Sequence, residues 1–148
     1  MKNLLLILTV IAFSFTWASC SAPKGLKFQK VEDLTILKDR NHPFIVYLQL
    51  YNPNKFPLEI KYGNIETFLE DLPLGELKYD TVIKVAGKET LNFPLAYNPD
   101  YRNMFANPEK RLSEPNLNVK INGSLAVEHK SKFYITNIHF QGDLPQAQ

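Results

Sequence analysis

The chain has 148 residues, which is enough for one domain with a sizeable hydrophobic core and too few for two ordinary domains. Its 17 lysines and arginines against 15 aspartates and glutamates leave a net charge of +2. Nucleic-acid binding requires a concentrated basic surface, so this near-neutral balance argues against a nucleic-acid partner. The sequence contains one cysteine, so no disulfide can form within the chain and the hydrophobic core must stabilise the fold.

Residues 1–19 have the order of a secretory signal peptide. Lys2 precedes an apolar run at residues 4–18, which is shorter than the roughly 20 residues that a helix needs to cross a bilayer. The only cysteine, Cys20, follows two small residues and resembles a bacterial lipoprotein processing site, although Trp17 replaces the usual aliphatic residue of that motif. We expect Cys20 to be lipidated and to begin the mature chain. The alternatives are an ordinary signal peptide cleaved nearby and a buried thiol.

The charged residues that follow the signal peptide form no strongly basic or acidic pattern. Loss of the signal peptide would remove only the charge of Lys2 and leave 16 basic against 15 acidic residues. Lys24, Lys27 and Lys30 follow the anchor closely, and they either touch anionic headgroups or, as we favour, line a solvated strand face. The sequence is expected to divide into a signal peptide at 1–19, a tether at 20–25, a folded domain at 26–141 and a flexible tail at 142–148.

The first strand is expected to begin near Leu26. Its apolar residues change phase at Val31, which indicates an irregularity or a β-bulge near Gln29 and Lys30. The polar segment 38–43 then forms a loop that leads to the next strand.

Residues 44–62 are the stretch around which the rest of the chain is expected to be organised, as two strands and the turn between them. In the first strand one phase is wholly apolar and the other amphipathic, which is typical of a central strand. In the second strand apolar residues alternate with residues that are expected to face water. The expected inward residues are Phe44, Val46, Leu48 and Leu50 in the first strand and Phe56, Leu58, Ile60 and Tyr62 in the second.

The turn consists of Asn52, Pro53 and Asn54. Pro53 restricts its own φ and disfavours the helical region for Asn52, while Asn54 tolerates the backbone angles of a tight turn. Polar loop residues can bind ligands, but we interpret this turn as a structural corner that sets the register of both strands. Substitutions here are expected to lower stability more than they alter any binding.

Four short strands are predicted to follow, at residues 65–69, 72–77, 82–86 and 91–97. The first two enclose a tight turn at Glu70–Asp71. Pro73, Gly75 and Pro94 interrupt or weaken a hydrogen-bonded ladder, so these residues are expected on sheet edges or at bulges.

Two helix-start signals come next, at Asn98-Pro99-Asp100 and at Asn107-Pro108-Glu109. Each offers an asparagine as N-cap, a proline at the first helical position and an acidic residue in the first turn. Tyr101, Met104 and Phe105 have the spacing of one helix face. One short helix, or two, is therefore expected to pack across one end of the sheets.

The pattern at residues 117–127 predicts one continuous strand. A hairpin at Asn122–Gly123 would turn Leu125 and Val127 to the wrong face, so we expect the strand to pass straight through the glycine.

The hairpin turn is expected at residues 129–131, before a last strand at 132–141. The apolar residues of this strand change phase, which predicts a bulge near Asn137. Taken together, the elements predict an all-β fold, an antiparallel β-sandwich of immunoglobulin-like or fibronectin-like build with about seven strands and one short helix.

The sequence carries no pattern typical of catalysis or metal binding. His42, His129 and His139 have no histidine or cysteine partner at ligand spacing. The acidic pairs Glu32–Asp33 and Glu70–Asp71 are expected to be solvated rather than to act in acid–base catalysis. Nucleophile elbows and glycine-rich phosphate loops are missing. We therefore expect no enzyme activity, no metal and no cofactor.

Four segments carry a family resemblance: Asn52–Leu58, Leu72–Gly75, Phe93–Leu95 and Val119–Leu125. They resemble the late embryogenesis abundant (LEA) type 2 family, whose domain is also called the water-stress and hypersensitive-response (WHy) domain, and the similarity extends over about residues 26–141. The resemblance implies a folded seven-stranded β-sandwich with a short helix, no catalytic residues and a role in protection against stress or desiccation. Similar bacterial proteins are often exported lipoproteins. Because no acidic residue directly follows Cys20, the resemblance implies an anchor facing the periplasm, on the outer membrane.

The resemblance and the anchor imply a non-catalytic domain tethered to the cell envelope that shields or binds envelope proteins or lipids under water stress. The alternative is a binding module that docks an envelope-assembly partner through an exposed sheet edge. The identity of a ligand or partner and the oligomeric state do not follow from the sequence.

Overall fold

The computed structural model describes residues 22–36, 44–79 and 81–145. These ranges contain eight strands and two short helices. In chain order they are β1 (Lys27–Ile36), β2 (Phe44–Tyr51), β3 (Leu58–Leu69), β4 (Leu72–Tyr79), β5 (Ile83–Val85), β6 (Thr90–Tyr97), α2 (Tyr101–Met104), α3 (Pro108–Leu112), β7 (Asn116–His129) and β8 (Lys132–Pro145). Cys20, the expected loop at 38–43 with His42, and residues 146–148 lie outside the described residues.

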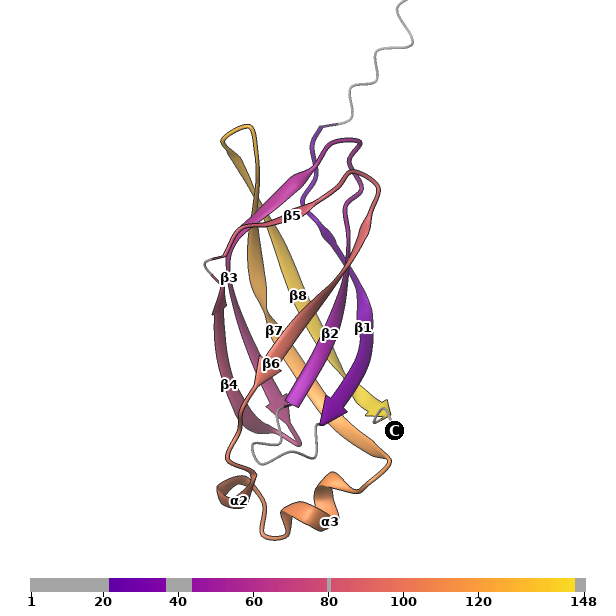
Figure 1. Ribbon diagram of the computed structural model, residues 1–148, viewed down its shortest axis with the longest axis vertical. Coiled ribbons are helices and arrows are strands. Elements are labelled where there is room, and N and C mark those ends of the chain that lie inside the picture. Colours follow the sequence, from indigo (N-terminus) through magenta and orange to yellow (C-terminus); the bar gives the residue numbers. More distant parts are fainter. Residues whose placement is uncertain (1–21, 37–43, 80, 146–148) are drawn as a thin grey trace, which may run out of the picture.

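The strands form two antiparallel sheets that pack face to face, as Figure 1 shows. The three-stranded sheet has the order β1-β2-β6, and the five-stranded sheet has the order β4-β3-β7-β8, with β5 paired to the first part of β3. The predicted all-β antiparallel sandwich is therefore confirmed. Since β2 and β3 belong to different sheets, the turn at residues 52–57 carries the chain from one layer to the other.

The two ends of the sandwich differ in what they contain (Figure 1). The upper end holds the start of the described chain, the β2–β3 connection, the β5–β6 turn and the β7–β8 turn. The lower end holds the β3–β4 turn, both helices and the C-terminal end of β8. We use "upper end" and "lower end" in this sense below.

The core lies between the two sheets and is built by alternation. Phe44, Val46, Leu48 and Leu50 of β2 are all fully buried, which confirms β2 as a central strand. Burying a leucine or phenylalanine side chain contributes about 1.5–3 kcal/mol. The five-stranded sheet supplies the opposing layer of fully buried side chains, namely Leu58, Ile60, Ile65, Leu69, Leu117, Val119, Ile121, Leu125 and Val127.

Strand β3 differs from the sequence-based expectation in two ways. It is one strand of 12 residues, so the expected separate strand at 65–69 is its second half. A register shift against β7 between Ile60 and Tyr62 reverses the alternation. Tyr62 consequently points outward with 54% of its surface exposed, and its predicted place in the core was wrong.

Strand β7 runs without a break from Asn116 to His129, which confirms the continuous strand through Gly123. A Cβ atom on Gly123 would lie 2.8 Å from the Ile65 Cα atom, so only glycine permits β3 to approach this closely. The predicted turns at Glu70–Asp71 and after His129 are confirmed. Both residues of each turn, Glu70 and Asp71 and then Lys130 and Ser131, have positive φ, as a type I′ two-residue hairpin turn requires.

Strand β8 contains no bulge near Asn137, because its register with β7 is continuous from Lys132 to Pro145. The predicted bulge was wrong since it assumed that every apolar residue faces the core. Phe133 and Ile135 instead point outward and are 54% and 60% exposed. The strand also extends beyond its expected end at residue 141, because Leu144 is buried against the core.

The remaining local predictions mostly hold. β1 shifts register between Phe28 and Lys30, as expected, and again between Val31 and Asp33. The strands with Pro73 and Pro94, β4 and β6, are edge strands.

Of the two predicted helix starts, one is confirmed and one was wrong. Asn107 caps α3, and its Oδ1 atom accepts from the Lys110 N–H at 3.2 Å. The cap of α2 is Asp100 rather than Asn98, and its Oδ1 atom accepts from the Arg102 N–H at 3.2 Å. The first expected start was wrong because β6 continues to Tyr97, so the chain is still leaving the sheet at Asn98.

Candidate functional site

The predicted turn residues form a buried polar cluster at the upper end. Asn52 is fully buried, and its Nδ2 group donates to the carbonyl oxygens of Phe56 at 2.9 Å, Val85 at 3.1 Å and Ala86 at 3.0 Å. Its Oδ1 atom accepts from the backbone N–H of Asn54 at 3.0 Å. One side chain therefore ties the β2–β3 connection to the end of β5, and it satisfies backbone groups that burial would otherwise leave unpaired.

Asn54 binds the backbone of the N-terminal segment in a similar way. Its Nδ2 group donates to the Lys24 carbonyl at 2.7 Å, and its Oδ1 atom accepts from the Lys24 N–H at 3.0 Å. The amide thus pairs with both backbone groups of Lys24 as a neighbouring strand would. Asn54 is 8% exposed, and its Nδ2 group also donates to Asn52 Oδ1 at 3.0 Å. The segment before β1 is held to the sandwich by this pair.

The β5–β6 turn completes the cluster from the other side. The Lys88 N–H donates to the carbonyls of Asn52 at 3.1 Å and Asn54 at 2.9 Å, and Lys88 Nζ donates to the Pro53 carbonyl at 2.6 Å. A Cβ atom on Gly87 would lie 2.5 Å from the Lys55 carbonyl carbon, so the two turns are in tight contact. We call Lys24, Asn52, Asn54, Gly87 and Lys88 the corner cluster.

The β7–β8 hairpin joins the same end through an aromatic contact. The rings of Phe56 and His129 stack with centroids 3.9 Å apart, and His129 Nδ1 lies 3.1 Å from the Pro57 carbonyl. These two contacts fix the His129 ring against the β2–β3 connection. The other described histidine, His139, pairs with Asn122 Oδ1 at 2.6 Å.

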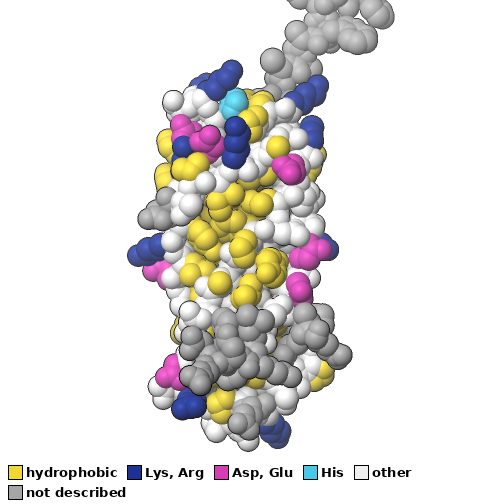
Figure 2. Space-filling model, in the orientation of Figure 1, with side chains coloured by type: hydrophobic (Ala, Val, Ile, Leu, Met, Phe, Trp, Pro, Cys, Tyr) yellow, Lys and Arg dark blue, Asp and Glu magenta, His cyan; other side chains and the backbone are white. Residues whose placement is uncertain are grey.

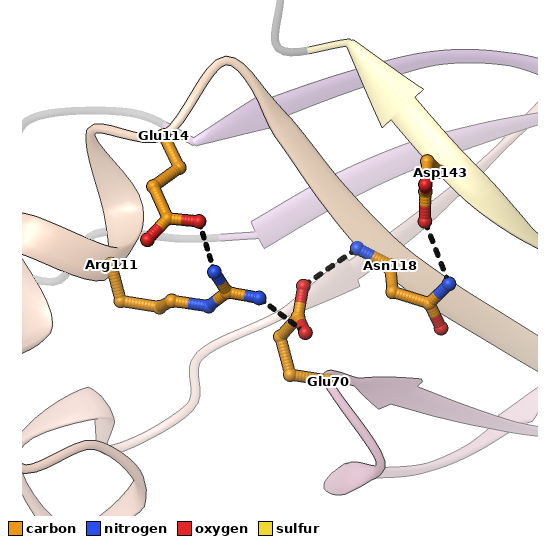
Figure 3. A network of polar contacts seen from close by, with 5 residues as sticks. All are labelled: Glu70, Arg111, Glu114, Asn118 and Asp143. Carbon is orange, nitrogen blue, oxygen red and sulfur yellow. Dashed lines mark hydrogen bonds and ion pairs between the residues drawn. The ribbon is translucent and has the colours of Figure 1, made fainter.

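The lower end is held by an ion-pair network, which Figure 3 shows from close by. Arg111 of α3 pairs with Glu70 of the β3–β4 turn and with Glu114. The bond with Glu70 raises the pKa of Arg111. Glu70 also accepts from the Asn118 N–H at 2.7 Å, and Asn118 Nδ2 donates to Asp143 at 2.7 Å. The network thereby links α3 to three strand ends, but its side chains are partly exposed.

A shallow surface hollow of about 260 Å³ lies beside α3. Its charged side chains include Arg111, Glu114 and Lys110, and the first two are already paired with each other. Among the described residues no group of three or more histidine, cysteine, aspartate or glutamate side chains could hold a metal ion. None of the helices in the described ranges is long and apolar enough to cross a membrane.

Two tyrosine hydroxyls in the interior have contrasting surroundings. Tyr97 Oη lies 2.7 Å from Thr67 Oγ1 and so bridges the two sheets. Burial raises the pKa of Tyr97 to about 12. Tyr101 Oη is buried without a hydrogen-bond partner among the described residues, and burial raises its pKa as well.

The structure brings together all three turn residues predicted from sequence, Asn52, Pro53 and Asn54. Sequence reasoning did not identify their partners Lys24, Gly87 and Lys88, because the contacts join segments about 30 to 35 positions apart along the chain. Gly87, in a short connection between two apolar sets, was the one available signal of a close backbone approach.

No family model and no curated protein sequence matches the chain. Three solved structures are similar in fold. AT1g01470 from Arabidopsis thaliana matches with a TM-score of 0.60 and 13% identity over 88% of each chain. At2g46140.1, described as a candidate late embryogenesis abundant (LEA) protein, matches with a TM-score of 0.52 and 11% identity over 97% of this chain and 87% of that one.

The third structure is a protein from Archaeoglobus fulgidus, with a TM-score of 0.53 and 10% identity over 82% of this chain and 98% of that one. At such identities the similarity concerns the fold and not the activity. The overall fold of the chain is thus similar to that of a protein described as a candidate LEA protein. The chain has the LEA type 2, or WHy-type, fold, as its sequence resemblance predicted.

Proposed function

We propose that the protein is a non-catalytic, lipid-anchored domain of the bacterial cell envelope that protects or binds envelope proteins or lipids during water stress. The observation that carries the proposal is the fold shared with a LEA protein along 97% of this chain. The proposed anchor is Cys20, on the periplasm-facing side of the outer membrane.

The corner cluster supports the anchor part of the proposal. Asn54 holds the backbone of Lys24 with two hydrogen bonds, so the sandwich begins only four residues after Cys20. An extended chain of four residues spans at most about 14 Å. Lipidation at Cys20 would therefore keep the upper end close to the membrane, which suits a domain that acts on lipids or on membrane-bound proteins.

A deletion strain tests the proposal. We expect the strain to lose viability after drying or osmotic shock and to accumulate aggregated envelope proteins, and we expect the intact gene to restore both. A Cys20→Ser variant should leave the membrane fraction, lose palmitate labelling and fail to restore survival. The neighbouring Ser21→Ala variant is the matched control and should behave as the intact protein. Normal survival of the deletion strain without aggregation would refute the protective role.

The alternative function is docking of an envelope-assembly partner by strand addition to a sheet edge. Two open edges carry residues that oppose such pairing, since Pro73 in β4 and Pro94 in β6 each lack a backbone donor. The Tyr79 hydroxyl also occupies the Pro94 carbonyl at 2.7 Å. Crosslinking in membranes distinguishes the two functions, because a docking module should yield one stoichiometric partner and a protective domain should yield many.

A further inference from the structure

Three large apolar side chains are exposed together on the outer face of the five-stranded sheet. Tyr62, Phe133 and Ile135 are 54%, 54% and 60% exposed, and the rings of Tyr62 and Phe133 lie 6.0 Å apart. In the sheet register Tyr62 and Ile135 both face Ala126, which is only 3% exposed. We call Tyr62, Ala126, Phe133 and Ile135 the apolar patch. Tyr62, Ala126 and Ile135 form a row across β3, β7 and β8, and Phe133 packs against Tyr62 from the neighbouring row, opposite Glu128.

The patch is confined to the upper part of this face. The next rows toward the lower end are polar, with Asn64, Ser124 and Asn137 in one row and Glu66, Asn122 and His139 in the other. An apolar group of this kind, bordered by polar rows, is typical of an interaction site.

The charges around the patch are arranged favourably for an anionic partner. The acidic groups beside it, Glu59 and Glu128, are both paired with Lys61, at 2.8 and 3.2 Å. Lys130 and Lys132, in and next to the hairpin turn, are exposed and form no ion pair with any described residue. Figure 2 shows basic side chains gathered at this upper end of the molecule.

The N-terminal segment emerges directly beside the patch. A Cβ atom on Gly25 would lie 3.3 Å from the Ile135 carbonyl oxygen, and Thr136 Oγ1 donates to the Leu26 carbonyl at 3.0 Å. Cys20 stands five residues before Gly25, and an extended chain of that length spans at most about 18 Å. A lipid at Cys20 therefore could not lie far from Ile135.

We propose that the apolar patch docks on the lipid surface itself, with Tyr62, Phe133 and Ile135 in the headgroup region and with Lys130 and Lys132 on anionic lipid phosphates. Aromatic side chains and lysines suit that interface, where one part of a group is apolar and the other is wet. A second copy fits less well, because three side chains supply much less than the roughly 800 Å² per partner of a stable protein interface. The inference rests on the proposed anchoring, and it adds an orientation in which the domain lies against the bilayer.

Single cysteines carrying an environment-sensitive dye test the orientation in the full chain. Lipidation would block the thiol of Cys20, so Ile135→Cys would provide the only reactive thiol. The matched control is Gln141→Cys, exposed on the same strand and six residues away, about 20 Å toward the lower end. Both proteins would be purified from membranes and reconstituted in vesicles of phosphatidylethanolamine and phosphatidylglycerol that contain a nitroxide-labelled lipid as quencher.

We expect the dye at position 135 to be quenched several-fold more strongly than the dye at position 141. Replacing phosphatidylglycerol by phosphatidylcholine should weaken the quenching, since each lysine loses about fivefold in its attraction to the surface. Equal quenching at both positions in anchored protein would overturn the inference and leave the anchor intact. A blue-shifted dye at position 135 that escapes lipid quenching would mean that a second copy covers the patch, and would overturn it too.

The state of Cys20 is read separately. If the unsubstituted chain, denatured in detergent, takes up the thiol dye, Cys20 is free and the proposed anchor fails, whatever the dye at position 135 reports. Unchanged melting temperatures of both cysteine variants would confirm that quenching differences come from orientation and not from unfolding.

Discussion

The two ends of the sandwich are held by different chemistry. At the upper end, Asn52 and Asn54 are buried and bond mainly to backbone groups of three separate segments. At the lower end, Arg111, Glu70 and Glu114 are partly exposed and bond mainly to one another. A buried amide that satisfies backbone carbonyls cannot be replaced by water, whereas an exposed ion pair competes with water and salt. The upper end should therefore be the more sensitive to substitution.

The largest effect is expected for Asn52→Ala. The change leaves the carbonyls of Phe56, Val85 and Ala86 without their side-chain donor, in a buried place for Val85 and a partly buried one for the other two, and we expect the free energy of unfolding to fall by about 3 kcal/mol. Denaturant unfolding followed by circular dichroism measures the difference. Asn64→Ala, at an exposed position of β3, is the matched control and should change stability by less than about 0.5 kcal/mol. Equal effects would contradict the role of the corner cluster.

A smaller effect is expected for Asn54→Ala, about 1–2 kcal/mol, because Lys24 keeps access to water after losing its two bonds. Pro53→Ala should cost less than about 1 kcal/mol, through greater freedom of the unfolded chain. Thermal unfolding checks both values. Association with membranes, measured in the same samples below the melting temperature, should remain as in the unsubstituted protein. A lipid- or partner-binding defect with unchanged melting would show that the turn is a binding site after all.

The next effect in size is expected from alkaline pH, which should lower the stability of the folded protein. Burial raises the pKa of Tyr97 to about 12 from an ordinary value of 10, and burial raises the pKa of Tyr79 to about 12 too. A group whose pKa is higher in the folded than in the unfolded state contributes its full stabilisation of the fold at any pH below its unfolded-state pKa. For Tyr97 this stabilisation is therefore present below pH 10 and is lost as the pH rises through about 12.

Melting temperatures of Tyr97→Phe and of the unsubstituted protein across this range test the assignment. The phenylalanine variant should lose less stability between pH 10 and 12 than the unsubstituted protein. Parallel profiles for the two proteins would mean that Tyr97 does not contribute to alkaline unfolding.

The smallest effect is expected for Arg111→Gln at the lower end. Its partners Glu70 and Glu114 remain accessible to water, so the melting temperature should fall only slightly. The difference from the unsubstituted protein should shrink further at high salt, because ions screen the pair. Melting curves at low and high salt measure it. A loss as large as that of Asn52→Ala would mean that both ends depend equally on their polar networks.

Local patterns predicted the elements well where the core enforces alternation. The apolar phase of β2, the passage of β7 through Gly123 and the turn at Glu70–Asp71 all follow from rules on period and turn chemistry. Errors came where outward positions carry apolar residues. Tyr62 was expected in the core because hydrophobic residues were assumed to be buried. The same assumption for Phe133 and Ile135 led to an expected bulge near Asn137 that does not exist.

The sequence by itself determined the fold class, the strand periods and the identity of the turn at Asn52, Pro53 and Asn54. Each of these depends on neighbours within a few residues, and the chain order supplies those neighbours directly. Only the tertiary structure decided that this turn joins two sheets, that Asn54 holds Lys24, and that three exposed apolar side chains meet near the start of the domain. Those contacts link residues 30 to 110 positions apart, and short-range periodicity contains no information about such pairs.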